Sequence, residues 1–388
     1  MVKFTIEKSE LAEAAIVMSA VANVKSQGAA PTDSMAVYLT ISTMTLVISN
    51  EANRCVIKDI PIAVVEGEIG QHTEQAYMIN TRKFASIIKN STKTIQFKVA
   101  ETQISISAGK RRFDLAVHTT IQKDIIGINL MPTPVNTKEI LPSFINANTL
   151  TSQVNGIAEF IGTLFVKNML LTSDRISALY IKDCKVFPDD QDIPDIVIAT
   201  DLFAAVLPKI KETSAYVGFT TDGQELVFQI DNITLAKRCL ENKFPKVQLL
   251  EAIDSIVHTE NPNAIIAKVS MKEFMDKLHE IKEIVEADQF FLTFNKADQS
   301  ISIQQNNTAQ NGTEGEVLVD AEITMPEGVV DGISDKFSYV HLDMFNKVFA
   351  KEKELTFITE HRILDNDQVL KQLCVKTDDK AFFCTPLK

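Results

Sequence analysis

The stretch Tyr77–Lys98, YMINTRKFASIIKNSTKTIQFK, has the pattern of a complete strand–helix–strand unit. A buried strand ends at Ile79, and the polar break after it offers Thr81 as the N-cap of a helix. The helix has apolar residues at positions i, i+3 and i+4, which are Phe84, Ile87 and Ile88. Alternation through Ile95 and Phe97 then predicts a second strand. The unit is therefore suited to packing a short amphipathic helix on a sheet.

This unit is basic although the chain as a whole is acidic. The chain has a formal net charge of -12, and only its first third carries more basic than acidic residues. Between Ala76 and Ala100 there is no acidic residue, but there are five basic ones: Arg82, Lys83, Lys89, Lys93 and Lys98.

The strand-to-helix spacing recurs along the chain. An apolar strand residue, four further residues and a first apolar helix residue occur together as Ile6/Leu11, Ile79/Phe84, Ile145/Leu150, Ile198/Phe203, Val269/Phe274 and Val340/Phe345. Several pairs enclose capping residues, namely Ser9, Thr81, Thr200, and Ser270 with Glu273. One such pair is weak evidence, but this many at similar intervals indicate an internally repeated fold.

The segments between these units alternate as β-hairpins, for example at Glu225–Ile230 and Ile233–Cys239 around Asp231–Asn232. Two connectors separate them into groups, the Pro-rich Pro132–Thr137 and the polar His258–Asn263. We therefore expect an α+β fold of three similar domains, 1–132, 133–258 and 259–388. Each would pack two helices on mostly antiparallel sheet.

Composition limits the class of protein. At 388 residues the chain exceeds a single ordinary core, and no run of eighteen apolar residues predicts a membrane span. The N-terminus enters a strand directly and lacks the apolar region of a signal peptide. Five scattered cysteines without metal-ligand spacing suggest reduced thiols. We expect a cytoplasmic protein with no membrane partner.

The search for catalytic motifs is negative. The chain has no glycine-rich phosphate loop, no H-E-x-x-H and no G-x-S-x-G elbow. The densest acidic cluster, Asp189, Asp190, Asp192 and Asp195, could hold a hard cation, but it lacks calcium-loop spacing and also fits a solvated loop. We expect no catalytic residue, no metal and no cofactor.

Basic residues instead recur at similar positions on the second helix of each predicted domain. They are Arg82, Lys83 and Lys89, then Lys209 and Lys211, then Lys347 and Lys351. Lysines on a helix often mark only a solvated face. Their recurrence with one sign, however, favours contact with a polyanion, because binding phosphates requires charge and little side-chain identity.

The repeats and several motifs together resemble the bacterial sliding clamp family, the β subunit of DNA polymerase III. The similar segments are the opening VKFTIEKSEL, Ile79–Lys89, Ser107–Leu115, Gly162–Phe165 with Thr172–Asp174, Phe244–Pro245, and the closing FFCTPLK. They run over essentially the whole chain and keep the family's order.

The resemblance implies a non-catalytic processivity factor. Two head-to-tail subunits would form a closed ring around double-stranded DNA, with helices lining the hole. The basic helix residues named above would face the DNA, and encirclement would retain an otherwise acidic protein. A polymerase and a clamp loader would bind through short linear motifs.

The resemblance also implies a groove for those peptides. By matched position its wall would include Phe160, Ser173, Arg175, Ile176, Ser177, Ala178, Pro245, Leu250, His341, Met344, Leu370, Gln372, Phe383, Cys384, Thr385, Pro386 and Leu387. The family's glycine–histidine–arginine–leucine turn is here Asp174–Ser177, and its aromatic residue in the last helix is Met344. These departures suggest a different preferred peptide and would fit a divergent or phage-encoded member.

Two other functions remain open. A DNA-modifying or phosphoryl-transfer enzyme would need a clustered acid, base or metal set, which the sequence does not contain in recognisable form. A clamp-fold interaction protein that no longer encircles DNA would keep the fold and lose the ring.

Overall fold

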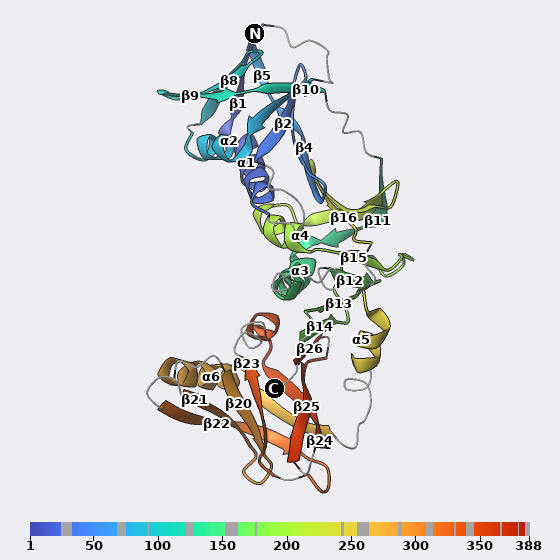
Figure 1. The fold of residues 1–388 in the computed structure, drawn as a ribbon. Helices are drawn as coiled ribbons and strands as arrows, with labels where there is room; N and C mark the ends of the chain where they lie inside the picture. The colour runs from blue at the N-terminus through green and yellow to red at the C-terminus, as the bar shows by residue number, and fades with distance from the viewer. Residues whose placement is uncertain are drawn as a thin grey trace. The chain divides into compact units, whose positions relative to one another are not determined.

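The computed structural model describes residues 1–24, 33–67, 75–91, 93–121, 127–151, 162–174, 177–241, 244–253, 264–285, 289–307, 313–329, 331–338, 345–364, 367–378 and 380–384. The chain forms two compact units (Figure 1). The first consists of Met1–Asn148 and Lys185–Glu241, and the second of Thr149–Cys184 and Asn242–Lys388.

The first unit contains a five-stranded antiparallel sheet. Its order is β5 (Ala63–Glu66), β1 (Val2–Glu7), β7 (Thr94–Val99), β8 (Gln103–Ala108) and β9 (Arg111–Ala116). The inner face is aromatic, since the Phe97 ring stacks on Phe4 with 5.0 Å between centroids and lies 6.5 Å from Phe84. β9 is an edge strand.

A second sheet of nine strands completes this unit. Its order is β10 (His118–Ile121), β6 (Gln75–Asn80), β2 (Ser34–Leu39), β3 (Thr43–Ser49), β4 (Asn53–Pro61), β18 (Ile233–Arg238), β17 (Glu225–Ile230), β16 (Ser214–Thr220) and β11 (Ile128–Asn136). The β4–β18 pair, from Asn53↔Lys237 to Ile57↔Ile233, joins segments far apart in the sequence. Because this pairing is continuous, predicted first-domain and second-domain strands form one sheet.

Helices of the first unit lie beside one another on these sheets (Figure 1). α1 (Lys8–Ala22) packs against α2 (Thr81–Lys89) on one side and against α4 (Asp201–Val206) and the 3-10 turn η2 (Leu207–Lys209) on the other. α3 (Thr137–Thr151) follows, its Phe144 ring 5.1 Å from Phe203 of α4. α1 has few charged residues because neighbours cover it on several sides.

The second unit is built on one long antiparallel sheet. Its strands follow the order β12 (Thr163–Val166), β13 (Met169–Ser173), β14 (Ser177–Ile181), β26 (Lys380–Cys384), β25 (Asp367–Lys376), β24 (Glu354–Leu364), β19 (Ala264–Ser270), β22 (Thr313–Thr324), β21 (Ser300–Asn307), β20 (Gln289–Asn295) and β23 (Ile333–Ser338). Its helical segments are α5 (Lys246–Ile253), α6 (Met271–Val285) and a helical turn at 345–349.

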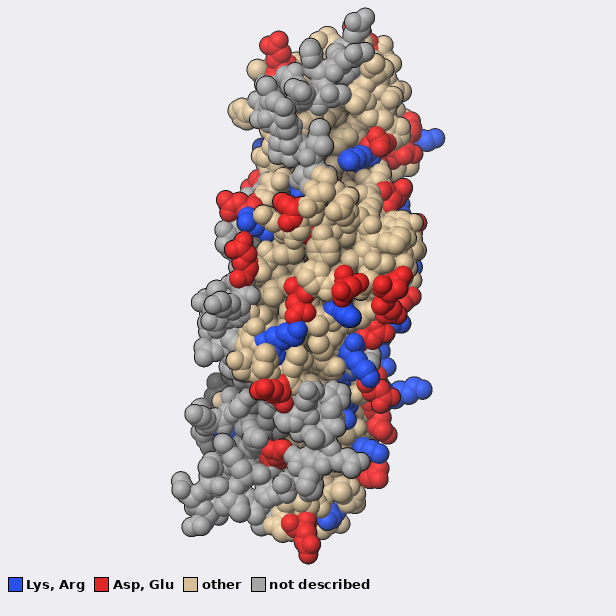
Figure 2. All heavy atoms as spheres, turned by 90° about the vertical axis from the view of Figure 1, so that its right-hand side faces the viewer, with Lys and Arg blue, Asp and Glu red and all other residues tan. Residues whose placement is uncertain are grey.

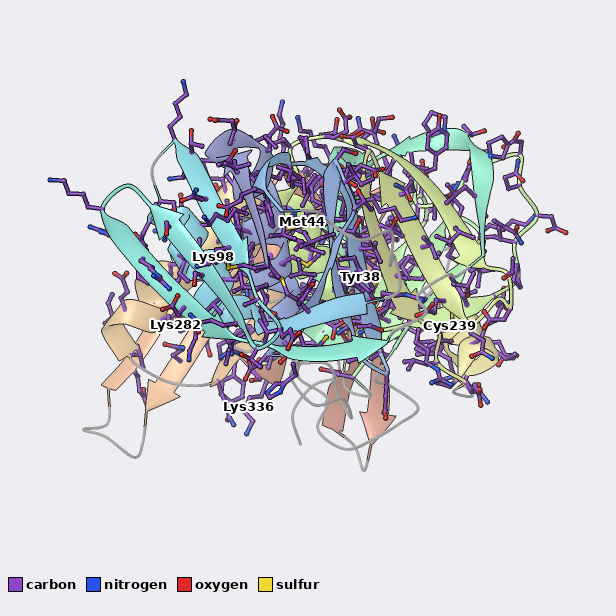
Figure 3. The ribbon with its side chains drawn as sticks, turned by 90° about the horizontal axis from the view of Figure 1, so that it is seen from above. Tyr38, Met44, Lys98, Cys239, Lys282 and Lys336 are labelled. Atoms are coloured by element: carbon purple, nitrogen blue, oxygen red, sulfur yellow. The ribbon has the colours of Figure 1, made fainter. Side chains whose placement is uncertain are left out.

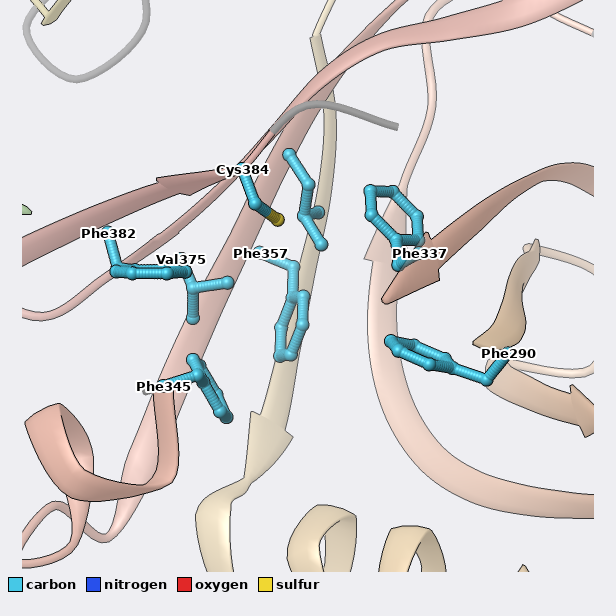
Figure 4. A pocket seen from close by; sticks show the side chains of 8 residues that line it. Phe290, Phe337, Phe345, Phe357, Val375, Phe382 and Cys384 are labelled. Atoms are coloured by element: carbon cyan, nitrogen blue, oxygen red, sulfur yellow. The ribbon is translucent and has the colours of Figure 1, made fainter. Parts of the chain in front are cut away.

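The core of the second unit is rich in phenylalanine. A pocket of about 10 Å³ lies among Phe290, Phe337, Phe345, Phe357, Leu373, Val375, Phe382 and Cys384. Figure 4 shows how these side chains face one another. A cavity of this volume holds one water molecule at most. This side of β25 and β26 is therefore packed interior and offers no room for a ligand.

The predicted α+β class is confirmed, and so are most of the strand-to-helix junctions. β1 leads into α1, β6 into α2, β15 (Ile196–Ile198) into α4 and β19 into α6. Of the last pair, Phe345 is buried in the helical turn, and Val340 lies outside the described residues.

The third junction is predicted at the wrong place, because Ile145 and Leu150 both lie inside α3. The true junction is Val135 to Ile140, which has the same spacing and runs from β11 into α3. Pro132–Thr137 is mostly strand and not a connector. Prolines are tolerated there because β11 is at the edge of its sheet and pairs on one side only.

The two units divide the predicted middle domain. β4–β18 pairing draws one part of it to the first unit, and β14–β26 pairing draws another part to the second. The three-domain boundaries remain a prediction, and the connector His258–Asn263 lies outside the described residues.

Local details also differ from the prediction. The N-cap of α2 is Asn80, whose Oδ1 accepts a hydrogen bond of 2.9 Å from the Lys83 backbone N–H. Thr81 is fully buried, and its hydroxyl has no partner. No helix that the structure describes has the length and apolar character to cross a membrane.

Candidate functional site

α2 presents a cationic face because its apolar stripe is fully used in packing. Phe84, Ile87 and Ile88 are buried, whereas Arg82, Lys83 and Lys89 are exposed. Lys98, from the same basic stretch, alternates with buried Phe97 on β7 and therefore lies on the other face of the sheet (Figure 3). The basic stretch thus serves two different surfaces.

A shallow groove runs between α1 and α2, and we call it the α1–α2 groove. Its lining residues are Lys8, Ala12, Ala15, Ile16, Ser19, Ala20, Asn23, Arg82, Ala85, Ser86, Lys89 and Lys209. The floor consists of small or apolar side chains, and the rim carries four cations. No carboxylate is among the lining residues.

The four cations have different surroundings. Arg82 Nε lies 3.3 Å from the Asp33 carboxylate, an exposed pair of little energetic weight. The Lys8 ammonium donates hydrogen bonds to the carbonyls of Lys89 at 3.1 Å and Ser91 at 2.9 Å, at the C-terminal end of α2. Lys89 and Lys209 are exposed, and no carboxylate of the described residues lies within ion-pair distance of either.

Lys8 is a candidate that sequence reasoning missed. It lies at the boundary between β1 and α1. Its side chain acquires a role in the groove only because the C-terminal end of α2, distant in sequence, lies beside it. Lys209 joins the groove because α4 and η2 pack on α1. Neither fact is visible in the spacing of charged residues.

Lys211 is placed differently from Lys209. Its backbone N–H donates to Glu13 Oε1 at 2.6 Å, and its ammonium lies 4.0 Å from the same carboxylate. It lines a separate cleft together with Glu10, Glu13, Glu212 and Asp231. The two lysines predicted together therefore lie in opposite electrostatic environments.

The remaining predicted cations belong to other places. Lys83 is exposed on α2 but does not line the groove. Lys347 and Lys351 are exposed in and just after the helical turn of the second unit. The face that includes β11 and β16 mixes acidic and basic side chains without a continuous basic patch in its described part (Figure 2).

Five predicted peptide-groove residues lie together at adjacent strand ends in the second unit. Ala178 of β14 is the pairing partner of Phe383 of β26, and Ser177 is the partner of Cys384. The Ser173 hydroxyl donates to the Ser177 carbonyl at 2.8 Å, closing the turn between β13 and β14. The structure therefore brings residues from two distant segments into one small region.

These residues are buried, and they face two ways. Phe383 and Ala178 are 2% and 7% exposed on one side of the sheet. Cys384 lies on the other side and lines the phenylalanine cavity, where burial strongly raises its pKa. Its side chain is therefore part of the packed core, unlike the groove position that the resemblance assigns to it.

The other groove candidates are only partly placed. Pro245 and Leu250 are half-buried at the start of α5 and within it. The side chains of Leu370 and Gln372 on β25 are not described. Outside the described residues lie Phe160, Arg175, Ile176, His341, Met344, Thr385, Pro386 and Leu387.

Chemical groups for metal binding are not gathered anywhere in the described part of the chain. No three His, Cys, Asp or Glu side chains there lie close enough to share an ion. The five cysteines are free thiols, and burial raises the pKa of Cys239 to about 11 and of Cys374 to about 12.

Comparison with known proteins gives matches in structure and none in sequence. No protein-family model matches the chain, and no curated protein matches it. The putative DNA polymerase III β subunit from Eubacterium rectale matches with a TM-score of 0.77 at 12% identity, over 100% of this chain and 99% of the other. The sliding clamp from Bacillus subtilis matches with a TM-score of 0.77 at 14% identity, over 100% and 99%.

The sliding clamp from Pseudomonas aeruginosa matches with a TM-score of 0.74 at 15% identity, over 100% of both chains. The resemblance seen in the sequence is thereby confirmed for the fold, and identities this low show the fold alone. Over its whole length, this chain has the fold of the bacterial DNA polymerase sliding clamps.

Proposed function

We propose that the chain is a sliding clamp: a head-to-tail homodimeric ring that encircles duplex DNA and tethers a polymerase to it. It would act as a cytoplasmic processivity factor with no cofactor and no catalytic chemistry of its own. The proposal rests on a pairing between two kinds of strand that occurs twice within the chain. A third copy of each of these strands has an edge that is unpaired in the described structure.

The junction has the same composition each time. β4 follows the β2–β3 hairpin, and it pairs with β18, the last strand of the β16–β17–β18 meander. β14 follows the β12–β13 hairpin, and it pairs with β26, the last strand of the β24–β25–β26 meander. Two repeats are thus joined each time by an antiparallel pair of corresponding strands.

A third strand of each kind, one that ends a meander and one that follows a hairpin, lacks such a junction partner among the described strands. β9 ends the β7–β8–β9 meander and is an edge strand. Residues 313–320 of β22 follow the β20–β21 hairpin and pair with β21, whereas pairing with β19 begins only at Ala321. The same junction between two copies would pair β9 of one with β22 of the next, which is a heterologous contact that can close a ring.

The two open edges are chemically complementary. β9 exposes Arg111, Arg112 and a Phe113 side chain that is 37% accessible. The open part of β22 exposes Glu314, Glu316 and a Leu318 side chain that is 55% accessible. Hydrogen bonds from Ser302 and Gln304 lower the pKa of Glu316, so this carboxylate stays ionised near neutral pH. Opposite charges around apolar side chains favour this pairing and select its register.

DNA binding within such a ring requires only weak attraction. Of the predicted cations, those supplying sequence-independent phosphate contacts would be Arg82, Lys89 and Lys209 in the first unit and Lys347 and Lys351 in the second. Retention would come from encirclement, which lets a chain of net charge -12 hold DNA and still slide.

Partner binding would use the region around Ser173, Ser177, Ala178 and Phe383 with Pro245 and Leu250. An apolar groove with a few polar groups suits a short linear motif from a polymerase or a loader. Deleting Pro386–Lys388 should abolish polymerase stimulation while leaving the dimer intact. Unchanged stimulation would remove the assignment of the groove.

The ring itself is tested by mass and by topology. Native mass at micromolar concentration should give a dimer, and a strict monomer would contradict the ring. Protein loaded on nicked circular DNA should stay bound, and linearising the DNA should release it. Equal retention on both forms would favour an interaction protein that does not encircle DNA.

A further inference from the structure

We infer that the α1–α2 groove holds the sugar–phosphate backbone of one strand of the duplex, with Lys8, Lys89 and Lys209 as its phosphate contacts. This inference deepens the proposed function and rests on it. It also divides the seven predicted cations, because Lys83 and Lys211 would take no part.

The floor of the groove lets a backbone approach closely. Ala12, Ala20 and Ala85 present only methyl groups there, and Ser19 and Ser86 add hydroxyls. Hydroxyl groups are common donors to phosphate oxygens, and such contacts carry no sequence information. A strand lying here would be held without being stopped at a particular base.

The electrostatics of the groove suit an anion even though a helix C-terminus opens into it. Uncovered carbonyls at the end of α2 would repel a phosphate. The Lys8 ammonium covers the carbonyl of Lys89, the last residue of α2, and that of Ser91 just beyond the helix, and Lys89 itself adds a positive charge in the last turn. An ammonium has three donors, so Lys8 can hold these carbonyls and still offer one to a phosphate.

The contrast with the neighbouring cleft sharpens the assignment. Four carboxylates line the cleft that contains Lys211, and none lines the α1–α2 groove. A phosphate near Lys211 would meet Glu13, whose carboxylate already accepts the Lys211 backbone N–H. The two exposed lysines of the groove, Lys89 and Lys209, have no such competitor among the described residues.

The test compares two double variants of the full-length protein. Binding of a short fluorescent duplex is followed by anisotropy over a salt series, after thermal melting and native mass have shown that each variant is folded and dimeric. Lys89→Ala/Lys209→Ala should weaken binding. It should also make the negative slope of log K against log salt shallower by about 2. The matched control Lys83→Ala/Lys211→Ala removes the same charge and should leave the slope near that of the wild type.

A second pair of variants tests the floor. Ser86→Glu places a carboxylate in the groove and should weaken duplex binding at least fivefold. Ser42→Glu, in the exposed β2–β3 turn, adds the same charge outside the groove and should have little effect.

The inference would be overturned if the two double variants lost the same duplex-binding affinity, or if the two serine variants did. It would also be overturned if the wild-type protein bound no duplex at low salt. Retention on nicked circles is measured separately. If the wild type is retained there but the variant pairs behave alike, the clamp function stands and the phosphate track is wrong.

Discussion

At the scale of single residues, Lys237 stands out among the described residues as a fully buried charged side chain. Its side chain is 2% exposed, and its ammonium lies 2.6 Å from Asp201 Oδ1 and 2.7 Å from Asn53 Oδ1. These residues come from β18, α4 and β4. Burial lowers the pKa of Lys237 below its usual 10.5, and the Asp201 carboxylate opposes that shift. The charge therefore depends on its partners, which tie α4 to the β4–β18 junction.

Removing the carboxylate alone should be costly. Asp201→Asn leaves a buried ammonium without its counter-charge and should lower the free energy of unfolding by about 3 kcal/mol. The double variant Asp201→Asn/Lys237→Met should recover most of that loss, since no buried charge remains. Urea unfolding measures both, and a double variant as unstable as the single one would show that the pair is not what holds this region.

The same lysine gives a pH dependence of known sign. The pKa of Lys237 is lower in the folded protein than in the unfolded chain, where it is about 10.5. At pH values between these two pKa values, the unfolded chain binds more protons at this lysine than the folded protein does. Wild-type stability should therefore rise with pH below 10.5, relative to Lys237→Met. A difference that falls with pH would mean that ion pairing outweighs burial at this site.

Asn80 determines where α2 begins. Its side chain accepts the Lys83 backbone N–H, so Asn80→Ala should cost about 1 kcal/mol of stability. Asn80→Asp keeps the acceptor and should cost much less. If both variants melt at the same temperature as the wild type, the cap contributes nothing.

At the scale of elements, the edge strand β11 depends on a glycine in its neighbour. Gly218 of β16 pairs with Leu130, and the pairing shifts register between Leu130 and Pro134. A Cβ added at Gly218 would lie 2.1 Å from the Asn129 carbonyl oxygen. Backbone atoms cannot move aside as a side-chain end can, so only glycine permits this approach.

Gly218→Ala should therefore loosen β11 and lower stability by about 2 kcal/mol. Amide hydrogen exchange should rise along residues 128–136 more than elsewhere. Gly127→Ala is the control, because its added Cβ would meet only the Thr221 side chain. Equal exchange in both variants would contradict the close-approach explanation.

At the scale of the whole molecule, the proposed copy-to-copy junction predicts a charge-swap result. Arg111→Glu/Arg112→Glu should dissociate the dimer, and so should Glu314→Lys/Glu316→Lys, because each makes both open edges alike in charge. A mixture of the two variants should form a heterodimer, since each edge then meets an opposite charge. Native mass spectrometry measures all three samples.

The control for this swap is Lys98→Glu, a charge reversal on the face of the same sheet and not on its edge. It should leave the dimer unchanged. Failure of the mixture to pair would show that β9 and β22 are not the surfaces in contact.

The local units of this protein follow from the order of its residues, without knowledge of the fold. Apolar spacing placed α2 and most strand-to-helix junctions, because burial of one face imposes a period on neighbouring residues. The same period does not reveal an edge strand that contains prolines. The sequence therefore predicts a linker at Pro132–Thr137, where the structure has the end of β11. It also predicts the N-cap of α2 one residue too late, at Thr81 and not at Asn80.

Which distant residues meet is a property of the folded chain. Lys209 reaches the groove of Lys8 and Lys89, while Lys211, two residues later, lies beside Glu13. Likewise, Phe383 of β26 lies opposite Ala178 of β14, a residue from a distant part of the sequence. The physical reason is that strand pairing across the chain, such as β4 with β18, sets these neighbours. Such pairing uses backbone hydrogen-bonding groups that every non-proline residue carries, so residue identity alone does not reveal which distant strands will pair.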